Sequence, residues 1–221
     1  MNPEIQPSLF ESIRTDDPGS NEAGSAGLIF ERELWSAGIQ HIAGVDEAGR
    51  GCLAGPVVAA AVICPRECKI DGVNDSKKMS SKTREVARIE IINSALAYGI
   101  GICSPEEIDH MNILWAAMEA MKRAVQSLSL RPDYVLIDGN RCFPDSPWPY
   151  RTIIGGDARS HSIAAASILA KTHRDHLMQK LDLENPGYGW ASNKGYPTRK
   201  HYAALDTYGP TKYHRRSFRL R

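Results

Sequence analysis

Apolar residues along this chain fall into short continuous runs separated by stretches with helical spacing. Residues 42–47, 57–63 and 134–138 are near-continuous runs, the first and last ending in acids, and such runs are typical of strands buried on both faces of a sheet. Residues 98–103, with alternating glycines, and residues 151–154 predict two further strands. Apolar spacing predicts helices over about 28–35, 80–97, 113–127, 158–181 and 198–208.

Two helix starts carry clear capping signals. Ser80 precedes a polar first turn, and Ser104 is followed by Pro105 and two glutamates, which is a favourable cap with acids near the positive end of the helix dipole. Strands dominate the first half of the chain, and helices separate several of them. The pattern therefore predicts an α/β fold with a central mixed sheet flanked by helices.

Length and polarity suggest three parts. The 221 residues suit one compact domain with a small appendage. Residues 1–27 have too little apolar content to pack and are expected to form a flexible acidic tail. We expect residues 28–185 to form the main domain and residues 186–221 a helical, basic extension.

Charge is uneven along the chain. The overall net charge is +1, but residues 194–221 hold eight basic side chains against one acid, a net charge of +7. Such a segment suits a polyanion such as nucleic acid, and a solvated surface is the plainer interpretation.

Several classes of protein are disfavoured. The five cysteines are odd in number and scattered, so neither a disulfide framework nor a zinc site is expected. The acidic N-terminus does not resemble a signal peptide, and no apolar run approaches the roughly 20 residues of a membrane span. A cytoplasmic location without membrane attachment is the expectation.

Four carboxylates stand beside glycines at the ends of short apolar runs: Asp46, Glu47, Asp138 and Asp157. Acids that converge at strand ends repel one another and need cations. Hard divalent ions with oxygen ligands, such as Mg²⁺, meet that need, so the set indicates a metal-dependent enzyme acting on phosphates. Taken singly, an Asp-Gly pair is also a turn signal, and Asp157 is also a candidate helix N-cap.

Adjacent acids raise a geometric difficulty. Neighbours on a strand point to opposite faces, so Asp46 and Glu47 share a site only if the strand ends and twists there. Gly49 and Gly51 would permit that twist. Otherwise Glu47 contributes its main-chain carbonyl or supports the site from behind.

The segments around these acids resemble the type 2 ribonuclease H family and, within it, bacterial ribonuclease HII. The resemblance runs in order over roughly residues 28–218. It rests on residues 46–51, 53–62, 74–78, 137–140, 156–160, 162–171, 194–198 and 214–218.

This resemblance implies a ribonuclease H-like fold with a C-terminal helical subdomain. It implies endonucleolytic cleavage of RNA in RNA/DNA hybrids, and of single ribonucleotides in duplex DNA, leaving 5′-phosphate and 3′-hydroxyl ends. The expected roles are ribonucleotide removal and RNA primer processing. The family's catalytic, metal-binding carboxylates fall on Asp46, Glu47, Asp138 and Asp157, with Mg²⁺ or Mn²⁺ as the ion.

The resemblance also assigns substrate contacts. Gly49, Arg50 and Gly51 match the family's ribose-reading loop, and Tyr196 matches a tyrosine that packs on the sugar beside the ribonucleotide. A plain turn and a packed tyrosine are the alternatives. Candidate phosphate contacts are Ser76, Lys77, Lys171 and Arg174.

Two features depart from the family pattern. Cys52 follows the glycine loop where proline is common, which suggests a looser loop and an oxidisable thiol near the site. Residues 6–10 (Gln-Pro-Ser-Leu-Phe) resemble the peptide by which bacterial replication proteins bind the sliding clamp, although Pro7 departs from the usual leucine.

Two other functions remain open from the sequence. A non-catalytic hybrid-binding protein would be expected to lack an acid, and none is missing. Another metal-dependent nuclease of the same fold would share the acids, but not the glycine loop together with Tyr196. A monomer is the default expectation.

Overall fold

The computed structural model describes residues 26–73, 76 and 79–220. Lys77 and residues 6–10 lie outside the described residues, so the predictions made for them have no structural outcome. The elements in chain order are α1 (Ile29–Ser36), β1 (Ile42–Ala48), β2 (Val57–Ile63), α2 (Ser81–Ser94), β3 (Ala97–Cys103), α3 (Pro105–Gln126), β4 (Tyr134–Asp138), β5 (Tyr150–Ile153), the 3₁₀ turn η2 (Gly156–Ala158), α4 (His161–Glu184), α5 (Trp190–Asn193) and α6 (Arg199–Tyr208).

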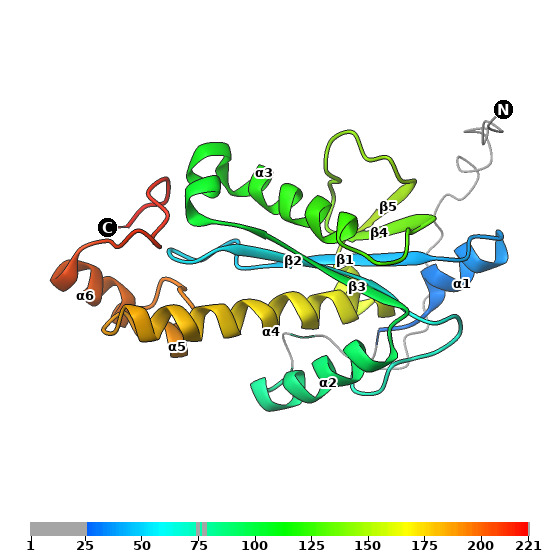
Figure 1. The fold of residues 1–221 in the computed structure, drawn as a ribbon, viewed down its shortest axis with the longest axis horizontal. Helices are drawn as coiled ribbons and strands as arrows, with labels where there is room; N and C mark the ends of the chain where they lie inside the picture. Colours follow the sequence, from blue (N-terminus) through cyan, green and yellow to red (C-terminus); the bar gives the residue numbers. More distant parts are fainter. Residues whose placement is uncertain (1–25, 74–75, 77–78, 221) are drawn as a thin grey trace.

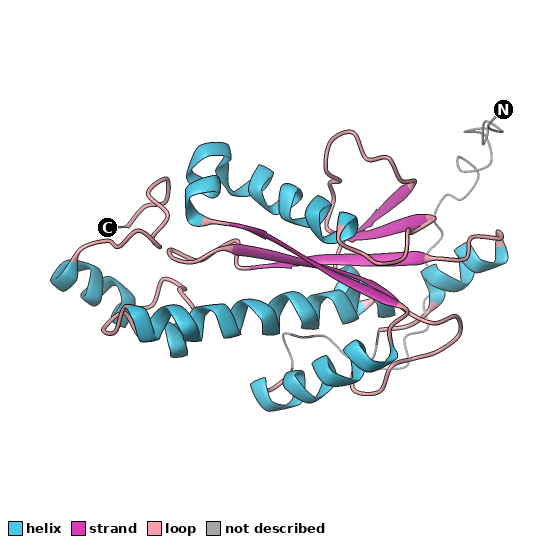
Figure 2. Cartoon of the chain, in the orientation of Figure 1, coloured by secondary structure: helices cyan, strands magenta, loops and turns pink. Residues whose placement is uncertain are grey.

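The strands form one mixed sheet in the order β3-β2-β1-β4-β5. β1 pairs antiparallel with β2 and parallel with β4, and β4 pairs parallel with β5. The sheet lies between helices, with α3 on one face and α4 on the other (Figures 1 and 2). The predicted α/β fold with a central mixed sheet is confirmed.

Both faces of the sheet are buried, as the continuous apolar runs predicted. Val57, Ala59 and Ala61 of β2 pack in one cluster with α3, whereas Ala60 and Val62 pack in another with α2 and α4. The helix α4 approaches β1 closely, because a Cβ on Gly44 would lie 2.1 Å from the backbone carbon of Ser162. Only glycine fits that crossing.

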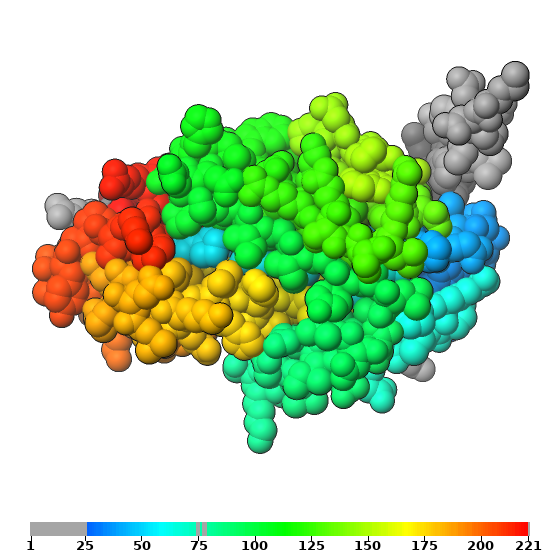
Figure 3. All heavy atoms as spheres, viewed as in Figure 1, coloured from blue at the N-terminus to red at the C-terminus, as the bar shows by residue number. Residues whose placement is uncertain are grey.

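The C-terminal residues pack against α4 and the loop that follows β1. Leu53 and Ala54, from the loop after β1, share an apolar cluster with Met178 of α4, with Trp190 and with Leu205. Figure 3 shows the C-terminal residues in red against the orange end of α4. No helix in the described part of the chain is long and apolar enough to cross a membrane.

The predicted start after Ser104 is confirmed, since α3 begins at Pro105 with a capping box, and it breaks at Asn112, whose φ is 67°, just before the predicted helix of residues 113–127. Other helix boundaries need correction, because α2 ends at Ser94 and Ala97 already pairs in β3. α4 begins at His161, after the separate turn η2, and the four-residue helix α5 has too short a pattern to have been predicted.

Candidate active site

The parallel pairing of β1 and β4 brings their terminal acids to one edge of the sheet. Val45 lies opposite Ile137 in the register, so Asp46 and Asp138 follow next to each other. Asp46 is 5% exposed and Asp138 is half-buried. Both line a cavity of about 490 Å³, together with Glu47.

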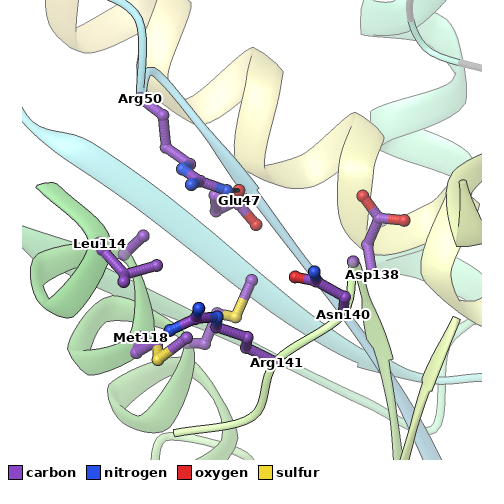
Figure 4. Close-up of a pocket in the computed structure, with 10 residues that line it drawn as sticks. Glu47, Arg50, Leu114, Met118, Asp138, Asn140 and Arg141 are labelled. Carbon is purple, nitrogen blue, oxygen red and sulfur yellow. Dashed lines mark hydrogen bonds and ion pairs between the residues drawn. The ribbon is translucent and has the colours of Figure 1, made fainter. Parts of the chain in front are cut away.

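Glu47 shares this edge with Asp46 although the two residues sit on opposite faces. In the register with β2, Asp46 pairs with Ala60 on the α4 side, and Glu47 pairs with Ala59 on the α3 side. Glu47 therefore lines the 490 Å³ cavity and also a second one of about 280 Å³ beside α3 (Figure 4). The two carboxylates straddle the last residues of β1, because the strand ends at Ala48.

Burial and mutual repulsion disfavour the ionised forms of these acids. Burial, and next the charges of Glu47 and Asp138, raise the pKa of Asp46 well above its ordinary value. Burial also raises the pKa of Glu47, while Arg50, 3.1 Å from the Glu47 carboxylate, works in the opposite direction. A cation between these carboxylates would remove the repulsion and favour their charged forms.

Asp157 lies beside these acids on the turn η2. It is 3% exposed, and it follows Gly156, whose N–H donates a 2.7 Å hydrogen bond to Oδ1 of Asp138. Ser160, not Asp157, caps α4, since the Ser160 hydroxyl accepts from the N–H of Ile163. The helix-cap interpretation of Asp157 is therefore wrong. Asp157 does not line either of the two cavities described.

The carboxylate set suits a hard divalent ion. Within the described residues, no group of three or more His, Cys, Asp or Glu side chains is arranged to hold a metal by itself. Mg²⁺ usually takes only one or two protein carboxylates, with water and substrate phosphate completing its coordination. Asp46, Glu47 and Asp138 offer oxygen donors and mutual repulsion at one edge, so their chemistry fits such an ion.

The glycine loop forms one wall of the same cavity. Gly49, Arg50 and Gly51 line it, and Tyr196, 40% exposed, lines it from the C-terminal segment. Gly49 has a φ of +98°, and a Cβ there would lie 2.0 Å from Nε of Arg174. Both the backbone conformation and the space require glycine at that position.

Arg174 does not lie where a phosphate contact was expected. Its guanidinium is fully buried and donates to the carbonyls of Pro56, Lys194 and Ala54 at 2.8–3.0 Å. The side chain shares the face of α4 that carries Lys171, but it points beneath the loop. The sequence prediction that Arg174 contacts phosphate is contradicted, because this side chain braces the loop instead.

Arg215 is a second brace that the sequence did not single out. It is fully buried and donates to the carbonyls of Gly55, Arg50 and Gly49 at 3.0, 2.9 and 2.7 Å. Burial lowers its pKa to about 10, so the guanidinium stays charged at neutral pH. One member of the basic C-terminal segment thus supports the loop from inside the protein.

Cys52 is fully buried between these braces. Burial raises the pKa of its thiol, which opposes formation of the reactive thiolate. The six carbonyls held by Arg174 and Arg215 also leave the loop well tied. The expectations of a looser loop and an oxidisable thiol are not supported.

Two other predicted phosphate contacts, Ser76 and Lys171, line the cavity. Ser76 is buried, with its hydroxyl 2.9 Å from that of Ser167, and Lys171 forms an ion pair with Asp175 at 2.6 Å. Ser167 and Arg84 also line this cavity and were not predicted. Ser167 hydrogen-bonds the Asp46 carboxylate, which favours its charged form.

Comparison with known proteins gives one family. The family model described as Ribonuclease HII matches residues 43–221. A curated ribonuclease HII from Salinibacter ruber is 56% identical over 196 residues, covering 87% of this chain and 98% of the relative.

Solved structures agree with this match. The ribonuclease H2 from Pyrococcus horikoshii superposes with a TM-score of 0.68 at 26% identity, covering 82% of this chain and 95% of that one. A ribonuclease HII from Archaeoglobus fulgidus, solved in complex with PCNA, gives the same score and identity over 82% of this chain and 96% of that one.

Proposed function

The chain belongs to the ribonuclease HII family and is an endoribonuclease, and from this premise we propose that it nicks duplex DNA on the 5′ side of a single embedded ribonucleotide. The observation that carries the proposal is that one cavity of about 490 Å³ is lined by the acids of β1 and β4, the glycine loop and Tyr196. Groups suited to cutting a phosphodiester and groups suited to reading a sugar therefore face the same space.

Asp46, Glu47, Asp138 and Asp157 would hold the divalent ions on which the family depends, and the N–H of Gly156, which precedes Asp157, donates to Asp138. A bound divalent ion supplies Lewis acidity and lowers the pKa of a coordinated water. Mg²⁺ and Mn²⁺ are the ions proposed. With the ions bound, the carboxylates would no longer repel the scissile phosphate, and one of their oxygens would accept a hydrogen bond from the water that attacks it.

Recognition of the ribose depends on its 2′-hydroxyl, which is the group that separates RNA from DNA at one position. Gly51 has open space where a side chain would stand, so a sugar can approach the main chain of the loop there, whereas Gly49 leaves room for Arg174 beneath the loop. Arg174 and Arg215 hold that loop in place. Tyr196 would pack on the sugar beside the ribonucleotide and favour a deoxyribose there, which would help to sense the RNA-to-DNA junction.

Ser76 and Lys171 are proposed to contact backbone phosphates, and Lys77 keeps the same proposed role from the sequence alone. Ser76 and Lys171 line the same cavity as the acids. Lys171 is paired with Asp175, so a phosphate would compete with that carboxylate for the ammonium group. Basic side chains of this kind position the duplex and carry no sequence preference.

Three labelled substrates test the proposal: a DNA duplex with one internal ribonucleotide, the same duplex without it, and an RNA/DNA hybrid. With Mg²⁺ or Mn²⁺ we expect one nick in the first, on the 5′ side of the ribonucleotide, leaving 3′-hydroxyl and 5′-phosphate ends. The hybrid should also be cut. Equal cutting of the all-DNA duplex would favour a general nuclease, and binding without cutting under either ion would favour a non-catalytic hybrid-binding protein.

A sliding clamp is a further proposed partner. The Archaeoglobus fulgidus relative was solved with PCNA, and residues 6–10 of this chain resemble a clamp-binding peptide. Deleting residues 1–12 should abolish binding to purified clamp in a calorimetric titration while leaving cleavage unchanged. The proposal would be wrong if clamp binding survived the deletion, or if the full-length chain did not bind the clamp.

We also propose that the protein is a monomer located in the cytoplasm.

A further inference from the structure

A buried aromatic cluster lies directly behind Tyr196. It contains Tyr188, Trp190, His201 and His214, which come from α5, α6 and the segments that flank them. Tyr188 stacks on Trp190 with centroids 5.0 Å apart, and the two imidazoles are 5.2 Å apart. Both histidines are at most 1% exposed.

The hydrogen bonds of this cluster form a chain with a defined direction. Nδ1 of His201 lies 3.0 Å from the Tyr196 carbonyl oxygen, which can only accept, so that nitrogen carries a proton. Trp190 Nε1–H, which can only donate, points at His201 Nε2 from 3.1 Å. Nε2 of His201 is therefore the unprotonated nitrogen.

The second histidine completes the chain. Its Nδ1 accepts from the backbone N–H of Thr211 at 3.0 Å, so its proton lies on Nε2. That Nε2–H faces the free Nε2 of His201 at 3.0 Å. The direction runs from Thr211 through His214 and His201 to the carbonyl of Tyr196.

Both imidazoles are neutral in this arrangement. A proton added to His201 Nε2 would face two N–H donors, and a proton added to His214 Nδ1 would face the Thr211 N–H. Burial accordingly lowers the pKa of both rings. The groups around them are Tyr188, Trp190 and the backbone of Thr211 and Tyr196, none of which is charged at neutral pH.

We propose that His201, oriented by His214, is a positioning residue. Its hydrogen bond to the Tyr196 carbonyl would hold the tyrosine where its ring can pack on the sugar of the substrate. The other backbone contacts of Tyr196 are local, since its N–H donates to the Asn193 carbonyl and its carbonyl also accepts from the N–H of Thr198. Its side chain, in a residue that is 40% exposed, meets the Cys52 thiol, and the centroid of its ring lies 5.9 Å from Nζ of Lys171. The neighbouring Gly195 carbonyl accepts from the N–H of Leu53, which ties Tyr196 to the glycine loop. Loss of the His201 contact would shift the tyrosine relative to the cutting centre.

The proposal rests on the proposed role of Tyr196, and two substitutions at His201 test it separately. Asparagine places an amide N–H near the position of Nδ1 and keeps the bond to Tyr196. Glutamine reaches the position of Nε2, where its oxygen can accept from Trp190 and His214, but it loses the bond to Tyr196. Both remove the imidazole, so they form a matched pair for structural damage.

The two variants are assayed on the duplex with one ribonucleotide, well below the melting temperature of either variant. We expect His201→Gln to lower kcat/KM about ten-fold and His201→Asn about three-fold or less. Small misplacements of a group that positions the substrate lower the rate steeply. Tyr196→Ala is measured alongside. If Tyr196→Ala is slow but the two His201 variants are equal, the positioning role is wrong and the function of Tyr196 stands. If Tyr196→Ala is as fast as the unmodified protein, the proposed function of Tyr196 fails first.

Nitrogen-15 NMR of labelled histidine tests the hydrogen-bond chain without any substitution. We expect neutral His201 protonated on Nδ1 and neutral His214 protonated on Nε2 at pH 7. The opposite tautomer at His201, or a charged ring at either position, would overturn the proposal.

Discussion

Replacing Arg215 with lysine tests how far a single buried side chain supports the ribose-reading loop. The guanidinium makes three hydrogen bonds, to the carbonyls of Gly55, Arg50 and Gly49 at 2.7–3.0 Å. Lysine keeps the charge but presents one ammonium group, which cannot span the three carbonyls. At least two buried carbonyls should lose this partner.

A buried acceptor left without a partner costs about 1–3 kcal/mol. Two of them predict that Arg215→Lys lowers the free energy of unfolding by about 2–6 kcal/mol. For a chain of this size that corresponds to a fall in melting temperature of about 4–24 °C. The loop should also become mobile, so kcat/KM for the single-ribonucleotide duplex should fall more than that for an RNA/DNA hybrid.

The assay pairs urea unfolding with cleavage kinetics, and Arg216→Lys is the matched control. Arg216 is exposed, and its backbone N–H donates a hydrogen bond to Asp109. We expect Arg216→Lys to stay within about 0.5 kcal/mol of the unmodified protein, as surface substitutions usually do. If Arg215→Lys were equally mild in both stability and cleavage, the bracing argument would be refuted.

Three further predictions follow from the site and its surroundings. Asp138→Asn removes charge but little volume, so the rate of cleavage should fall by about two orders of magnitude or more. The melting temperature should hold or rise, because the repulsion between this carboxylate and Asp46 is relieved. An unchanged rate of cleavage would contradict the assignment of Asp138 to the active site. Gly49→Ala should destabilise the fold by at least about 1 kcal/mol in urea unfolding, because it combines a φ of +98° with a Cβ 2.0 Å from Nε of Arg174. Burial lowers the pKa of His214 to about 4 in the folded protein. Below about pH 6.5 the unfolded chain therefore binds more protons than the folded protein. The free energy of unfolding should fall as the pH is lowered from 6.5 to 4, by up to about 3 kcal/mol from this group. Unfolding free energies of the His214→Gln variant should show a shallower fall over that range, and an unchanged slope would count against the assignment.

Much of the fold could be predicted because its strands are unusually explicit in the sequence. The run at residues 57–63 is apolar at every position and is buried at every position, and the acids come where such runs end. Asp46 and Asp138 are adjacent because β1 and β4 are parallel and in register. That pairing is a long-range property that no local pattern contains.

The braces were harder to predict than the acids. Arg174 was predicted to contact phosphate because spacing on a helix shows which face a side chain shares, and not whether its long stem turns outward or inward. Arg215 stands beside Arg216 in the same basic segment, yet one is fully buried and the other exposed. Their difference comes from the loop carbonyls that surround Arg215, which are about 160 residues away in the chain.

The position of Glu47 follows from where β1 ends. Alternation along the strand was read correctly, since Asp46 and Glu47 do lie on opposite faces. The two still line one cavity because the sheet stops beside them, so both side chains reach around its edge.

The central claim is that the protein cuts where a single 2′-hydroxyl lies against the glycine loop beside the carboxylates. It is tested most directly by kcat/KM on three duplexes that differ in one atom or group, with ribose, 2′-fluoro-deoxyribose or deoxyribose at the same position. We expect cleavage 5′ of the ribose, and loss of at least two orders of magnitude in kcat/KM for both replacements. Comparable cleavage of all three duplexes would contradict the claim.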